Sequence, residues 1–141
     1  MTLKTKYLME ELIGELRLIS ERMKKEQDIS KKLYYYSAAY GSTNRILRIE
    51  FDTELLLADL VLNTAYGLVQ SRLQAVMAGD RVVPLKQESI DELADCVAEL
   101  ADSFEDRKDC CHILQRIASI AFQTTGAGYY MSATGRIPAQ K

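Results

Sequence analysis

The amino-acid sequence predicts an all-α protein, an antiparallel (up-down) bundle of four long helices plus one or two shorter helices. Apolar residues recur every three or four positions in five successive segments, as they do in amphipathic helices. No segment shows the sustained alternation of apolar and polar residues that marks a half-buried strand. The 141 residues include only two prolines and seven glycines, which favours long uninterrupted helices.

The first helix is predicted at residues 3–26 and the second at residues 31–49, with Ser30 as the N-cap of the second. One apolar stripe defines the first helix: Leu8, Leu12, Leu16, Ile19 and Met23. The inward stripe of the second helix is predicted to hold Leu33, Tyr36, Tyr40, Asn44 and Leu47, within about 60° of one another. Its second apolar face holds Ala38, Ala39, Ile46 and Ile49. Such a helix packs between two neighbours, or between a neighbour and another subunit.

Asp52 or Thr53 is the predicted N-cap of the third helix, which ends near residue 78, before Gly79. Its main stripe holds Leu55, Leu62, Ala65, Tyr66, Val69, Leu73 and Val76. Apolar residues outside the main stripes form a surplus, and these are Ala39, Ile46, Leu57, Val61 and Leu68. One subunit is not expected to cover this surplus, so we expect a homo-oligomer.

Ser89 and Glu92 match a capping box and predict the start of the fourth helix, whose stripe ends at Phe104. The fifth helix is predicted to begin near residue 109, and Gly126 and Gly128 either end it or let it continue to about residue 132. A single helical-bundle domain should therefore span residues 1–135, with a C-terminal tail at residues 136–141.

Composition excludes several classes of protein. The net charge of −2 gives no electrostatic footprint for nucleic acid, so no nucleic-acid partner is expected. The most apolar run, residues 55–62, is far shorter than the ~20 residues that span a bilayer, so no membrane partner is expected. Three cysteines without a CxxC pair suggest a reducing compartment, and the predicted location is cytoplasmic.

Acidic residues are concentrated around the fourth helix, where residues 88–109 hold nine acids and two bases. The pairs Glu92/Asp95 and Glu99/Asp102 have the ExxD spacing that binds Mg²⁺ in all-α nucleotide pyrophosphatases. Their side chains point away from the apolar stripe of the helix, however: with Glu88 at 0°, the acids lie within about 40° of it and the apolar stripe lies between about 120° and 200°. A solvated acidic face is the preferred interpretation, and a docking surface for a basic partner is the intermediate one.

Cys110, Cys111 and His112 are adjacent, but consecutive helical residues point about 100° apart and cannot converge on one metal ion. Cys110 belongs to an apolar stripe, and His112 lies opposite it. The sequence therefore predicts no metal site, no catalytic residue and no cofactor.

A stripe of aromatic and polar residues on the second helix is the only candidate binding site, consisting of Tyr36, Tyr40, Asn44 and Arg48. Buried phenols and amides need hydrogen-bond partners. Candidate partners on the third helix are Asp59, Asn63 and Gln70. The stripe predicts either a polar network inside the core or a small-molecule pocket with Arg45 or Arg48 at its edge.

Charge is divided unevenly along the chain. Residues 1–48 carry ten bases and six acids, whereas residues 49–141 carry eight bases and fourteen acids. The division predicts either that the first and fourth helices lie side by side, or that the basic part of one subunit meets the acidic helix of another.

Tyr40-Gly41-Ser42-Thr43-Asn44, with the segment LVQSRLQAV at residues 68–76, resembles the ATP:cob(I)alamin adenosyltransferases. The resemblance implies a five-helix bundle that assembles as an oligomer, a trimer in that family, and it carries no active site over to this chain. The helix plan is also similar to that of uncharacterised archaeal proteins that form antiparallel helical bundles, which implies no function.

The sequence thus favours a non-catalytic, self-associating interaction or structural protein. The alternatives are a protein of adenosyltransferase type that binds a small molecule, nucleotide or cobalamin, and a metal-dependent nucleotide pyrophosphatase that uses the paired carboxylates.

Overall fold

The computed structural model describes residues 3–82 and 84–134, with side chains described as far as Gln123. The described part of the chain is all-α, as predicted, with five helices and no strand. They are α1 (Lys6–Lys25), α2 (Ile29–Leu47), α3 (Thr53–Met77), α4 (Gln87–Glu105) and α5 (Cys111–Thr134). All five contain 19 to 25 residues, so α5 is as long as the others. The predicted tail at residues 136–141 lies outside the described residues.

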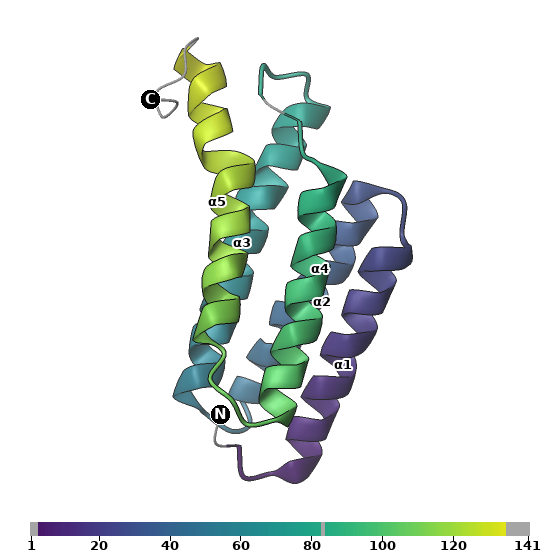
Figure 1. Cartoon of the computed structure of the whole chain (residues 1–141), viewed down its shortest axis with the longest axis vertical. Coiled ribbons are helices and arrows are strands. Elements are labelled where there is room, and N and C mark those ends of the chain that lie inside the picture. The colour runs from purple at the N-terminus through teal and green to yellow at the C-terminus, as the bar shows by residue number, and fades with distance from the viewer. Residues whose placement is uncertain (1–2, 83, 135–141) are drawn as a thin grey trace.

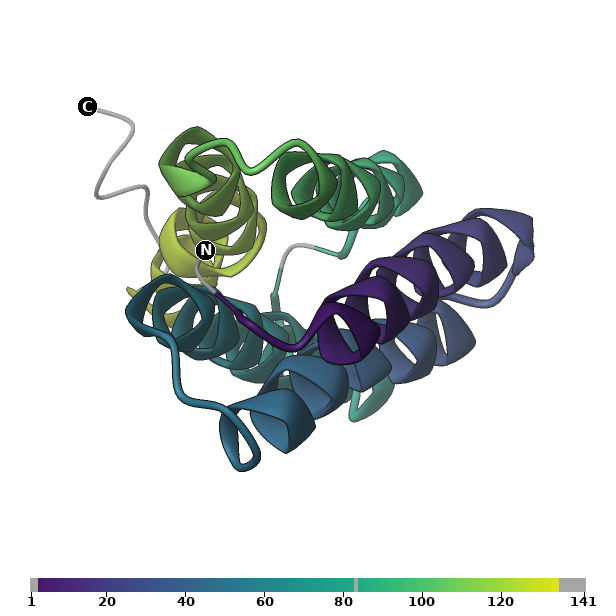
Figure 2. The same cartoon turned by 90° about the horizontal axis from the view of Figure 1, so that it is seen from below.

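The helices lie side by side along the long axis of the molecule (Figure 1). α1 contacts α2 and α4, α3 contacts α2 and α5, and α4 contacts α5, so the helices form a closed ring. A smaller contact between α2 and α4 crosses this ring. Figure 2 shows the ring from one end. The first and fourth helices are therefore neighbours, which confirms one of the two interpretations of the uneven charge.

The buried core follows the predicted stripes of the first and fourth helices. Leu12, Leu16 and Met23 on α1 are fully buried, as are Leu93 and Val97 on α4. Among the described helices, none is long and apolar enough to cross a bilayer.

Aspartates cap the N-termini of α2 and α3. Asp52 accepts a hydrogen bond of 2.9 Å from the Leu55 amide, which confirms one of the two predicted caps of α3. Asp28, rather than the predicted Ser30, caps α2, and it accepts from the Ser30 amide at 3.2 Å. The helix begins earlier than predicted because Asp28 supplies a carboxylate oxygen one turn before the stripe.

The predicted start of the fourth helix is wrong. α4 begins at Gln87, since the Lys86 carbonyl already accepts from the Ser89 amide at 3.1 Å, which places Ser89 inside the first turn. α5 continues past Gly126 and Gly128 to Thr134, which agrees with the predicted alternative of an end near residue 132. Glycine weakens a helix by only about 1 kcal/mol relative to alanine, which a long helix tolerates.

The buried face of α2 is rotated by roughly 80° from the predicted one. The side chains of α2 that are 1% exposed or less are Lys32, Leu33, Tyr36, Ala39, Thr43 and Ile46, so the predicted stripe was correct at Leu33 and Tyr36. Ala39 and Ile46 therefore offer no apolar surface for self-association, and that part of the prediction is wrong. The physical reason is that α2 contacts three helices, α1, α3 and α4, which bury Ala39 and Ile46 and leave Ala38 and Ile49 exposed.

Candidate functional site

The outward face of α3 is uncharged from Leu55 to Ala78. The only charged residues in this segment are Asp59 and Arg72, and both are buried. Burial also lowers the pKa of the Arg72 guanidinium from its usual value. The exposed residues of the segment are Leu57, Leu60, Asn63, Thr64, Gly67, Leu68, Ser71, Gln74, Met77 and Ala78.

Three leucines and Met77 are the large apolar side chains on this face. Leu57 is 52% exposed, Leu60 is 51% exposed and Leu68 is 43% exposed. Leu57 and Leu68 were predicted from the sequence as surplus apolar residues, together with Val61, which is half-buried. Isolated exposed leucines are common, but apolar residues gathered on one uncharged face mark an interaction surface.

The neighbouring helix α5 extends this face. Its exposed described residues are Cys111, His112, Gln115, Ala118, Ser119, Phe122 and Gln123. None of them carries a charge at pH 7 with His112 neutral. We call the outward sides of α3 (residues 55–78) and α5 (residues 111–123) together the neutral face.

A groove lies within the neutral face, between α3 and α5. It has a volume of about 230 Å³. It is lined by Leu60, Val61, Thr64, Ala65, Leu68, Ala118 and Ala121. The groove exists because the α5 side contributes only alanine methyl groups, which leave space beside the leucines of α3.

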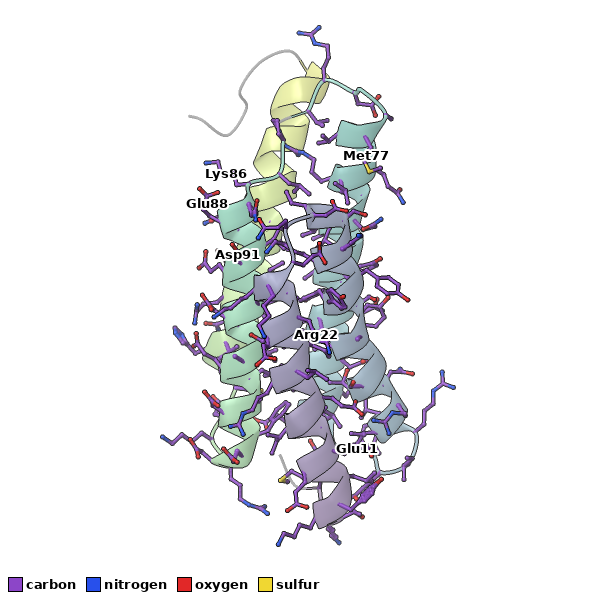
Figure 3. All side chains as sticks on the ribbon, turned by 90° about the vertical axis from the view of Figure 1, so that its right-hand side faces the viewer. Glu11, Arg22, Met77, Lys86, Glu88 and Asp91 are labelled. Atoms are coloured by element: carbon purple, nitrogen blue, oxygen red, sulfur yellow. The ribbon has the colours of Figure 1, made fainter. Side chains whose placement is uncertain are left out.

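The opposite side of the molecule is charged and paired. Arg17 on α1 donates to Asp102 at 2.8 Å and to Glu105 at 2.6 Å, and Lys24 pairs with Asp95. Figure 3 looks onto α1 and shows the polar side chains that it and α4 carry on this side. Exposed pairs of this kind contribute about 0–1 kcal/mol each, so their main effect here is to neutralise the acids of α4.

Three of the four carboxylates of the pyrophosphatase hypothesis are thus engaged in ion pairs. Asp95 and Asp102 pair with α1, and Glu99 accepts from Arg116 on α5 at 2.7 Å. Among the described residues, no three His, Cys, Asp or Glu side chains are grouped so that they could hold a metal ion. No described carboxylate cluster therefore offers a magnesium centre.

The cysteine and histidine cluster does not converge. Cys110 is 1% exposed, whereas Cys111 and His112 are exposed on α5. His112 borders a shallow acidic depression near the end of α4 that also includes Asp106 and Asp109. These placements agree with the directions expected from helical geometry.

The aromatic and polar stripe of α2 is divided between the core and the surface. Tyr36 is fully buried, and its hydroxyl donates to the Leu62 carbonyl oxygen at 3.1 Å. Burial raises the pKa of this phenol well above its usual range. Tyr66 on α3, which the sequence assigned only to the apolar stripe, joins the group, with ring centroids 6.4 Å from Tyr36 and 5.5 Å from Tyr40.

The other two members of the stripe bind each other. Asn44 Oδ1 accepts from Arg48 Nε at 3.0 Å, at the exposed end of α2. Arg45 binds Glu11 and Glu15 of α1 and does not contribute to the Asn44–Arg48 pair. The structure brings Tyr36 and Tyr40 together around one ring of α3 and keeps Asn44 with Arg48, so the four candidates form two separate groups.

Two polar pairs with at least one buried member were not predicted from the sequence. The Thr43 hydroxyl donates to Asp59 at 2.6 Å, and the Lys32 ammonium group donates to Asp91 at 2.7 Å. The signal was present: Lys32 and Thr43 are in register with Tyr36 at helical spacing. A lysine on an apolar stripe is ordinarily assigned to the surface, because buried lysines are rare.

No protein-family model, curated protein or solved structure matches this chain.

Proposed function

We propose that this protein is a non-catalytic, cytoplasmic antiparallel helical bundle that associates with a second copy of itself through the neutral face. The uncharged exposed surface of α3 carries this proposal. The other described helices α1, α2 and α4 all carry charged residues on their exposed sides, for instance Arg17 on α1, Lys31 on α2 and Glu92 on α4. A helix surface without exposed charges between residues 55 and 78 can be buried in an interface without the cost of desolvating ionised groups.

A second copy is the occupant that the charge distribution favours. In a two-fold dimer the same patch lies on both sides of the interface, so a charged patch would meet its own sign. The neutral face carries no charge that would oppose this pairing. A basic or acidic partner would gain nothing from a surface that lacks countercharges.

The size of the neutral face is also adequate. The α3 segment is about 36 Å long and about 10 Å wide, and the described exposed part of α5 adds about 20 Å of helix. Together they present roughly 560 Å², close to the ~600 Å² per partner at the lower end of stable interfaces.

Sedimentation equilibrium of the full chain with a matched pair of substitutions tests the proposal. Leu60→Arg places a charge at the centre of the neutral face, whereas Leu18→Arg places one on α1. The two leucines are 51% and 50% exposed, so the substitutions differ in position and not in burial. We expect a wild-type dimer, a Leu60→Arg monomer and a Leu18→Arg dimer.

Two results would overturn the proposal. One is a wild-type protein that remains monomeric at high micromolar concentration. The other is equal dimerisation of both arginine variants, which would place the interface elsewhere. Helical circular dichroism of each variant verifies that it is folded before its mass is interpreted.

A further inference from the structure

We propose that the dimer is held by reciprocal insertion, in which Phe122 of each copy occupies the α3–α5 groove of the other. This inference rests on the proposed function and names the contact that would give the association its geometry. Phe122 is 63% exposed on α5. It lies on the same uncharged face as the groove, one helical turn after the groove-lining Ala118.

The groove and the phenyl ring match in size and chemistry. An apolar cavity of roughly 150 Å³ accommodates a benzene molecule, and the groove holds about 230 Å³. Its lining is aliphatic except for Thr64. A phenyl ring needs no hydrogen-bond partner, so it suits a pocket with almost no polar group.

Phe122 leaves the groove of its own chain open. Side chains on a helix lean toward its N-terminus, which directs Phe122 over the turn that contains Ala118, yet most of its surface remains exposed. A second copy would cover the exposed ring of Phe122 and fill the open groove in the same contact. In a two-fold interface each contact occurs twice, so one face carrying both a protruding ring and a groove is self-complementary.

The test compares two variants alone and mixed. Phe122→Ala removes the ring and keeps the groove, whereas Ala118→Trp fills the groove from an exposed position and keeps the ring. Neither homodimer retains a ring in a groove, and the mixed dimer retains one of the two. Truncation of a buried aromatic anchor weakens binding about tenfold or more. Because the Phe122→Ala homodimer loses two rings, its Kd should rise about 100-fold.

We expect each variant to be monomeric at a concentration at which their equimolar mixture still dimerises, measured by sedimentation velocity with one variant labelled. Leu18→Ala, on α1, should dimerise as the wild type does. If Phe122→Ala dimerises normally while Leu60→Arg is monomeric, insertion is wrong and association through the neutral face stands. If the mixture associates no more tightly than its components, insertion is also wrong. A monomeric wild type overturns both proposals.

Discussion

The Lys32 ammonium group lies 2.7 Å from Asp91 Oδ1 and 2.7 Å from the Met23 carbonyl oxygen. These two hydrogen bonds join α2 to α4, across the ring of helices, and to the last full turn of α1. The Lys32 side chain is 1% exposed, whereas that of Asp91 is 44% exposed. The cation is thus enclosed while its counterion remains in contact with water.

The first prediction concerns this pair. Asp91→Ala leaves a buried ammonium group with only a carbonyl oxygen as acceptor, and we expect a loss of about 1–3 kcal/mol in the free energy of unfolding. Lys32→Met should cost less, because it removes the charge that needs a partner and keeps the apolar stem. Urea unfolding followed by circular dichroism measures both values.

A double-mutant cycle provides the control for that prediction. Lys32→Met combined with Asp91→Ala should be less destabilised than the sum of the two single substitutions. The reason is that either substitution alone already removes the Lys32–Asp91 interaction. Strict additivity would show that the two side chains do not interact in solution.

The second prediction concerns the buried hydroxyl of Tyr36. Tyr36→Phe removes the hydrogen bond to the Leu62 carbonyl oxygen and retains the ring, so we expect a loss of about 1 kcal/mol in the free energy of unfolding. Tyr34→Phe is the matched control, since Tyr34 is 74% exposed and should leave stability unchanged. Equal urea midpoints for Tyr36→Phe and the wild type would contradict this assignment.

The third prediction concerns the start of α1, where Thr5 makes no side-chain cap. The Glu50 carboxylate binds the two residues just before this helix, and accepts from the amides of Lys4 at 2.5 Å and Thr5 at 3.2 Å. These amides hold the pKa of Glu50 below its usual value of 4.5. The folded state therefore favours the ionised carboxylate.

The sign of the pH effect follows from this lowered pKa. The contribution of Glu50 to stability should be complete above pH 4.5 and should disappear as the pH falls through the pKa of the folded state. Glu50→Gln should accordingly be less stable than the wild type near neutrality, with a gap that closes in acid. Glu92→Gln, at an exposed position on α4, should show no such gap. Thermal unfolding across this pH range measures the difference.

The fourth prediction concerns the cysteines. Cys111 is exposed, whereas Cys96 and Cys110 are buried, and burial raises their pKa to about 11 and about 12. A thiol-reactive chromogenic disulfide should therefore modify one thiol quickly in the native protein and all three after denaturation. Cys111→Ser should abolish the fast phase. Rapid reaction of a second thiol would contradict the packing around α4 and α5.

The buried faces of the helices were predicted best where charged and apolar residues occupy opposite sides of a helix. The stripes of α1 and α4 were correct because ionised residues occupy their opposite faces. On α2 the two apolar sides are similar in hydrophobicity, and Lys32 lies on the one that is buried. Helical periodicity alone could not rank these faces, since the third contact of α2, with α4, depends on the whole chain.

The candidate site was predictable only in part. Leu57 and Leu68 followed from the surplus of apolar residues on the third helix. The groove did not, because it depends on how Ala118 and Ala121 of α5 are placed against α3. Phe122 gave no signal of its own, since one aromatic residue near the end of an amphipathic helix is ordinarily part of the core.

The pairing of α1 with α4 also affects how the chain acquires its fold during synthesis. The Ser20 hydroxyl donates to the Ala94 carbonyl oxygen at 2.7 Å, and these residues are 74 positions apart. Until α4 leaves the ribosome, α1 has only α2 to cover its apolar stripe. Nascent chains of intermediate length should therefore expose leucines to chaperones and proteases, and a stalled product that ends before residue 87 should aggregate.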